Sequence, residues 1–151
     1  MARKTSKPGA VFCIPLEENL FAYARQITAA LFECFDFFGN QREDATVVAQ
    51  QPVLFTLSVH KYVHTDSKWE PIGEVPVPEN YPMPLFFHQD IGNEDICHLV
   101  DTKGNRTYVP RAACVGYERR AVWDYEHVES RLIDHYHNRE NKWEKLLRVK
   151  L

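Results

Sequence analysis

The sequence predicts a mostly β, α+β fold: a small, strongly curved antiparallel sheet or partly open barrel with a C-terminal helix. Three observations lead to this prediction. Nine Phe, seven Tyr and three Trp among 151 residues favour strands, because aromatic side chains pack well on a pleated, half-buried surface. Short apolar runs separated by turn residues recur through most of the chain. A helical apolar period follows only after Gly116.

The first two strands are expected near the beginning of the chain. Residues 1–7 are polar and are expected to form a loose tail, and Pro8-Gly9 is a turn signal. A strand is predicted over 10–14 and another over 21–27, where bulky and small side chains alternate. This period of two is typical of a half-buried strand in a curved sheet.

The third apolar run is expected to be the most buried strand. Residues 30–38, "ALFECFDFF", are largely apolar on both faces, which favours the centre of the sheet. A polar loop over 39–46 follows, and the next strand is predicted over 52–63. Residues 64–87 carry five of the nine prolines, so we expect an extended loop or an edge strand there, because proline removes backbone donors.

The second half of the chain predicts a hairpin and a helix. The runs "DICHLVD" and "RTYVPRAACV" flank the turn "TKGN". A helix is expected over 122–140, with Asp124 as its N-cap, and residues 139–151 either extend it or pair as a last strand. We therefore expect one domain over 1–151, in which 8–116 form the β-rich body.

Charge and cysteine spacing exclude several function classes. The net charge of −3 does not favour a nucleic-acid binder, which normally has a basic surface, so no nucleic-acid partner is expected. The four cysteines form no Cys-x-x-Cys pair and lie in apolar runs, as expected for core residues of a reduced, cytoplasmic protein. No secretion signal is recognisable, and no apolar stretch approaches the 18 or so residues of a membrane span.

Seven histidines raise the question of metal binding and acid–base chemistry. His60 and His64 would lie roughly 13 Å apart on the predicted strand, too far to share one ion. His135 and His137 would point in opposite directions on a helix. Local motifs for an activated nucleophile and glycine-rich phosphate loops are also missing. We therefore expect no catalytic residue, no metal and no cofactor, and predict that the protein is not an enzyme.

Two features are candidates for contact with a partner. Trp69 lies in the proline-rich segment, where it is interpreted either as an interface anchor or, preferably, as a cap on the core of the sheet. Asp90, Glu94 and Asp95 form a short acidic stretch, "QDIGNED". Such a stretch is usually a solvated turn, but it can also present an acidic surface.

Several of these phrases resemble the immunity protein 26 family of bacterial polymorphic toxin systems. They are "PGAVFCIPL" over 8–16, Tyr23 and Arg25 in the following strand, and "WEPIG" over 69–73. The resemblance covers roughly residues 7–90. Ala10 stands where the family phrase has Asp, so a polar role at that turn is not carried over.

The resemblance implies a function in which binding alone suffices. Such a protein would neutralise a cognate toxin, often delivered between neighbouring bacteria, by direct binding in the cytoplasm. A basic nuclease is one toxin class that an acidic surface would attract and occlude. On this hypothesis the toxin-binding residues are Asp90, Glu94 and Asp95, with Trp69 nearby. The resemblance defines neither the toxin nor the oligomeric state.

Two other classes of function remain open at this point. A small barrel of the SH3-like kind could bind nucleic acid or a ligand, and "YERRAVW", with Tyr117, Arg119, Arg120 and Trp123, is its local candidate. A hydrolytic enzyme could assemble its site from distant residues. Such an enzyme would reveal itself by a pocket that combines perturbed carboxylates with histidine.

Overall fold

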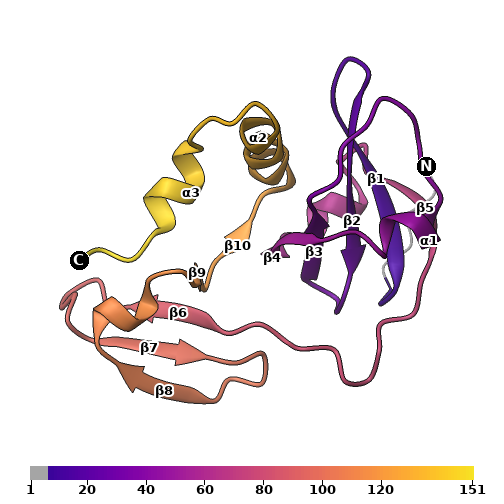
Figure 1. Cartoon of the computed structure of the whole chain (residues 1–151). Coiled ribbons are helices and arrows are strands. Elements are labelled where there is room, and N and C mark those ends of the chain that lie inside the picture. Colours follow the sequence, from indigo (N-terminus) through magenta and orange to yellow (C-terminus); the bar gives the residue numbers. More distant parts are fainter. Residues whose placement is uncertain (1–6) are drawn as a thin grey trace. The chain divides into compact units, whose positions relative to one another are not determined.

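The computed structural model describes residues 7–151, which form two compact units (Figure 1). The larger unit consists of residues 7–79 and 122–141, and the smaller unit of residues 80–121 and 142–151. All of the predicted loose tail except Lys7 lies outside the described residues. The single domain expected over 1–151 stays a prediction.

The larger unit is built on a six-stranded sheet in the order β10-β4-β3-β2-β1-β5. Its strands are β1 (Ala10–Glu17), β2 (Leu20–Gln26), β3 (Leu31–Phe35), β4 (Val53–Val59), β5 (Glu70–Glu74) and β10 (Val122–Trp123). Neighbouring strands are antiparallel except β10, which pairs in parallel with β4. The mostly β fold with an open antiparallel sheet and a helix near the C-terminus is therefore confirmed.

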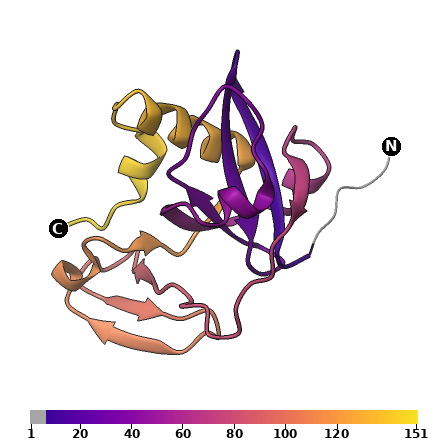
Figure 2. The same ribbon diagram turned by 45° about the vertical axis from the view of Figure 1, so that its right-hand side comes forward.

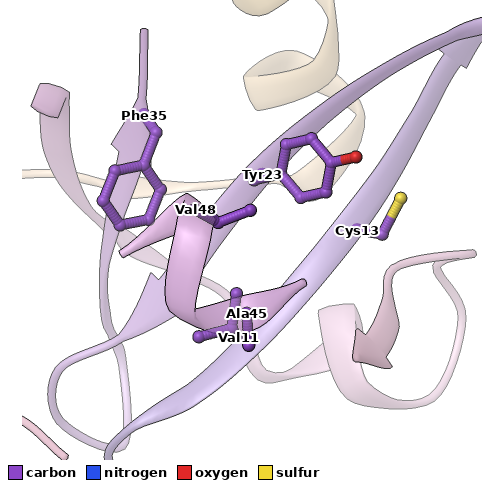
Figure 3. Packing of buried hydrophobic residues seen from close by; sticks show 6 residues of the cluster. All are labelled: Val11, Cys13, Tyr23, Phe35, Ala45 and Val48. Carbon is purple, nitrogen blue, oxygen red and sulfur yellow. The ribbon is translucent and has the colours of Figure 1, made fainter. Parts of the chain in front are cut away.

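One face of this sheet packs against the short helix α1 (Ala45–Val48) (Figure 3). The apolar cluster there combines alternate strand positions with two helix residues: Val11, Cys13, Tyr23, Phe35, Ala45 and Val48. Ile72 and Val75 of the proline-rich segment pack against the same cluster. These contacts explain how a segment rich in proline still provides β5 as an edge strand.

Helix α2 (Tyr125–Tyr136) packs in the larger unit through its buried residues Val128 and Leu132. Arg131 on the same helix lies over the Phe55 ring of β4, with 4.1 Å between the guanidinium carbon and the ring centre. Helix α1 covers one face of the sheet, and apolar side chains cover the other. Strands β1 to β3 are therefore buried on both faces. The expectation that the second strand would be only half-buried is therefore wrong.

The C-terminal helix is shorter than predicted, and its end explains why. Asn138 has the left-handed φ of 57°, and its backbone amide donates to the His135 carbonyl. The Arg139 amide donates to the Asp134 carbonyl at 2.7 Å. Together, these two hydrogen bonds form a pattern that commonly ends an α-helix. Residues 139–151 therefore neither extend α2 nor form a strand. They form a separate helix, α3 (Lys142–Leu147), and an irregular end.

The smaller unit contains a four-stranded sheet in the order β8-β7-β6-β9 (Figure 2). Its strands are β6 (Phe86–Gln89), β7 (Cys97–Val100), β8 (Arg106–Val109) and β9 (Glu118–Arg119), with β9 parallel to β6. The predicted hairpin is confirmed as β7 and β8, and Gly104 at its tip has a φ of +89°. Phe87, Cys97 and Cys114 form the buried centre, to which Val149 from the last residues adds.

The strand predicted over 52–63 ends earlier. After Val59 the chain forms the 3₁₀ helix η1 (Lys61–His64), and the His60 ring nitrogen Nδ1 accepts a hydrogen bond from the Tyr62 amide. His60 and His64 thus do not lie on one strand. A second 3₁₀ helix, η2 (Arg111–Cys114), follows β8 in the smaller unit, so the second predicted hairpin strand ends at Val109.

Candidate partner-binding surface

The predicted acidic residues lie in the loop between β6 and β7, residues 90–96, which we call the acidic loop. Its conformation is fixed by its own polar groups. The Asp90 carboxylate accepts a hydrogen bond from the Asn93 amide at 2.8 Å, and the Asn93 side-chain oxygen accepts one from the Asp95 amide at 3.1 Å. The Asp90 amide donates to the Ile96 carbonyl and closes the loop. The three acids proposed from the sequence therefore lie together in one ordered loop.

One buried amide side chain holds the base of this loop. Gln89 is 3% exposed, and its Nε2 group donates to the Glu94 carbonyl at 2.9 Å and to the Lys150 carbonyl at 2.8 Å. Its Oε1 atom accepts a hydrogen bond from the Lys150 amide at 2.9 Å. Gln89 thus connects the acidic loop to the last residues of the chain, a connection that the sequence does not signal.

The charges of the acidic loop are only partly compensated. Asp95 pairs with Arg111 at 2.6 Å, although its own side chain is 75% exposed. Glu94 is exposed and, within the described residues, forms no ion pair. The loop therefore presents negative charge to solvent, mainly from Asp90 and Glu94.

An apolar side chain stands in the middle of these acids. Ile91 is 98% exposed, and Ile96 at the end of the loop is 46% exposed. An isoleucine fully in solvent on an ordered loop gains nothing from folding, whereas burial against a partner would stabilise a complex. Sequence reasoning missed Ile91, although a single apolar residue within "DIGNED" was a usable signal.

The smaller unit as a whole has many exposed apolar side chains. It contributes nine of the fourteen large exposed apolar residues found in the described part of the chain, although it is the smaller of the two units: Met83, Leu85, Ile91, Ile96, Tyr108, Val115, Tyr117, Leu146 and Leu151. A partner that binds this unit would therefore meet apolar as well as charged side chains.

Trp69 is in the core. Its side chain is fully buried, its ring packs edge-on against Phe32 at 5.8 Å, and its indole nitrogen donates to the Glu129 carboxylate at 2.8 Å. This position agrees with the interpretation as a core residue and gives a partner no access to the indole. Trp69 belongs to the larger unit and the acidic loop to the smaller one.

Of the four residues considered for nucleic-acid binding, Arg119 and Trp123 are engaged in internal contacts, whereas Tyr117 and Arg120 are exposed. The Arg119 guanidinium lies 4.7 Å from the centre of the Phe87 ring, and its Nε donates to the Leu147 carbonyl at 3.0 Å. Trp123 is buried, with Arg131 over its ring at 5.3 Å. Neither side chain is therefore free to stack on a base.

A cavity of about 370 Å³ lies in the smaller unit between η2, β9 and α3. Its charged lining residues include Glu144 and Arg148, which pair with each other at 2.7 Å. Cys114 also lines it, and burial raises the pKa of this thiol, which opposes formation of the nucleophilic thiolate. Among residues 7–151, no group of three or more His, Cys, Asp and Glu side chains is placed to hold a metal ion.

Comparison with known protein families gives a match over most of the larger unit and the beginning of the smaller one. The sequence model of the family described as Immunity protein 26 matches residues 7–97. This range takes in β1 to β6 and the whole acidic loop, and ends at the first residue of β7. No curated protein and no solved structure matches the chain. In the described part of the chain, every helix is too short or too polar to cross a membrane.

Proposed function

The chain belongs to the immunity protein 26 family, and from this membership we propose that it neutralises a cognate toxin by binding to it directly. The toxin would be the effector domain of a bacterial polymorphic toxin used in competition between neighbouring cells. Inhibition by binding requires complementary shape and charge, but no reaction catalysed by the inhibitor. We propose that this protein acts in the cytoplasm and is not an enzyme.

The observation that supports this proposal most directly is the acidic loop with Ile91 at its centre. Its conformation is fixed before any partner arrives, so binding costs little ordering entropy. Ile91 can enter an apolar pocket of the toxin, while Asp90 and Glu94 attract basic groups around that pocket. An apolar anchor surrounded by polar residues is the usual composition of a binding hot spot.

The negative charge of the acidic loop supports the proposal that the toxin has a basic surface. Nucleases have basic substrate-binding surfaces, because they must neutralise phosphates. An acidic loop directed at such a surface would speed association and block access of the nucleic acid. We therefore propose a basic toxin, with a nuclease as the first class to test.

The proposal is tested by expressing the toxin domain encoded by the neighbouring open reading frame in a host that lacks the inhibitor. We expect growth arrest with the toxin domain alone and normal growth when this protein is co-expressed. The two purified proteins are expected to co-elute in size-exclusion chromatography and to bind in a calorimetric titration. Arrest that persists at high inhibitor levels, without any complex, would contradict the proposal.

A further inference from the structure

Strand β8 is an open edge of the sheet in the smaller unit. It has a single neighbour, β7, among the strands of this sheet, and Figure 1 shows it as the outer strand of the hairpin. Its residues Arg106, Thr107 and Tyr108 are all exposed, and Tyr108 is 69% exposed. No strand among the described residues of the smaller unit pairs with its outer side. It is therefore available to another protein chain.

The hairpin geometry identifies the backbone groups that point outward. The Asp101 amide donates to the Asn105 carbonyl, so these two residues form a hydrogen-bonded pair across the turn. Hydrogen-bonded and non-bonded pairs alternate along an antiparallel ladder. The pairs of Arg106 with Val100 and of Tyr108 with His98 are therefore non-bonded. The amide and carbonyl groups of Arg106 and Tyr108 thus point away from β7.

The side chains beside these outward groups are cationic and aromatic. His88, His98 and Tyr108 form a row of rings on one face, with centres 4.9 Å and 5.6 Å apart. Arg106 lies on the same face, two residues from Tyr108, and forms no ion pair with a described carboxylate. Burial, followed by the charges of His88, Arg106 and Arg120, lowers the pKa of His98, which agrees with a positive potential here.

We propose that β8 receives an extended segment of the toxin as an added strand, with an acidic residue of that segment opposite Arg106. The segment would exchange backbone hydrogen bonds with Arg106 and Tyr108. An apolar residue two positions from the acid would then lie opposite Tyr108, since side chains of paired residues share a face. This inference rests on the proposed function and specifies which kind of toxin segment is bound.

The length of the edge limits what can bind. Gly104 in the turn and Pro110 directly after Val109 bound the strand on both sides, and proline has no amide to donate. A short edge strand resists unspecific pairing with other chains. The acidic loop lies at the opposite end of β7 from Arg106, so the two ends of this sheet favour opposite charges on the partner.

The test is amide hydrogen exchange by NMR on the labelled protein, free and in complex with the toxin domain. In the free protein the amides of Arg106 and Tyr108 are expected to exchange rapidly, and in the complex at least about tenfold more slowly. If the complex forms and neutralises the toxin while both amides still exchange rapidly, this inference is wrong and the proposed function stands. If no complex forms, both are wrong.

A matched pair of variants provides a second, independent measurement. Arg106→Glu is expected to weaken binding of the toxin domain about three- to tenfold, because it places like charges opposite each other. Lys103→Glu makes the same charge change in the turn of the same hairpin and is expected to change affinity less than about twofold. Equal affinities of both variants, with unchanged circular dichroism and melting temperature, would overturn the inference.

Discussion

Arg25 on β2 and Glu33 on β3 lie directly opposite each other and form an ion pair of 3.0 Å inside the larger unit. Their side chains are only 9% and 2% exposed. A second guanidinium nitrogen of Arg25 reaches the Pro76 carbonyl at 3.5 Å. The pair thus links two central strands to the proline-rich segment that continues from the edge strand β5.

Removing one partner of this pair is expected to destabilise the protein strongly. Glu33→Leu leaves the Arg25 charge buried without its carboxylate and is expected to lower the free energy of unfolding by about 3–5 kcal/mol. Urea denaturation measures this difference. The double variant Arg25→Leu with Glu33→Leu removes both charges and is expected to be more stable than the single variant. A double variant less stable than the single one would contradict this account.

Gly73 allows β5 and α1 to approach closely. A Cβ atom added at this glycine would lie 2.8 Å from the Cβ atom of Ala45, which is too short for two carbon atoms. Gly73→Ala is therefore expected to lower the free energy of unfolding by about 1–3 kcal/mol. Adding Ala45→Gly removes the opposing atom and should recover part of the loss.

Gly39→Ala is the matched control for this prediction. The methyl group added there would lie 3.8 Å from the nearest atom, an ordinary contact distance. Its expected effect is below about 1 kcal/mol. Similar losses of stability for Gly39→Ala and Gly73→Ala would show that contact with α1 is not the cause.

The four cysteines are free thiols and all are buried, so they report on unfolding. Burial raises the pKa of Cys34 to about 12 and also raises that of Cys13, so thiolate is scarce at neutral pH. Labelling with a disulfide reagent at pH 8 is expected to be slow in the native protein and to reach four thiols in guanidinium chloride. One thiol that reacts within seconds without denaturant would contradict the burial of that cysteine.

Much of the larger sheet could be predicted because its strands are long and their apolar pattern is clear. The run over 30–38 indicated a central strand, and β3 is buried at every position. The half-buried pattern expected for β2 was wrong, because its alanines face apolar partners and not solvent. Periodicity alone cannot tell a small buried residue from a small exposed one.

Elements defined by tertiary contacts could not be predicted. β9 and β10 are two residues long, and each pairs in parallel with a distant strand, so no local period exists for them. For the candidate site, Asp90, Glu94 and Asp95 could be proposed because charged residues are read directly from the sequence, and their role in binding stays a prediction. Ile91 was missed because its isolation among polar residues, which is the signal that the sequence offers, does not by itself show that its side chain is exposed.

Stability is expected to fall at mildly acidic pH because of His98. Burial, and then the charges of His88, Arg106 and Arg120, lowers its pKa in the folded protein below the ordinary 6.5. The unfolded chain therefore binds a proton more readily, and the contribution of His98 to stability is lost as the pH falls below about 6.5.

Melting temperatures measured from pH 7.5 to pH 5 test this expectation. His98→Gln cannot take up the proton, so its melting temperature is expected to fall less over the same range than that of the unchanged protein. His127→Gln is a suitable control, because this histidine is partly exposed on α2 and belongs to the larger unit, whereas His98 belongs to the smaller one. Parallel pH curves for the His98 variant and the unchanged protein would contradict the prediction.

Charge reversal in the acidic loop is expected to weaken toxin binding. Reversal at Asp90, Glu94 and Asp95 together should abolish neutralisation, but Asp90 also fixes the loop and Asp95 pairs with Arg111. Glu94→Lys is the cleaner variant and is expected to slow association, most strongly at low salt. Glu18→Lys at the exposed β1–β2 turn is the control for net charge. If the variant with all three charges reversed still neutralises the toxin, the acidic loop is not part of the interface.

A substitution at Ile91 is expected to change the affinity for the toxin without changing the stability of the fold. Because its side chain is 98% exposed, Ile91→Ala is expected to leave the melting temperature unchanged. If Ile91 is the anchor of the complex, the same variant should weaken the affinity for the toxin domain about tenfold or more, measured by calorimetry. Val53→Ala, at an exposed position of the larger unit, is the control and should bind normally. An Ile91→Ala protein that binds as tightly as this control would place the toxin contact elsewhere on the molecule.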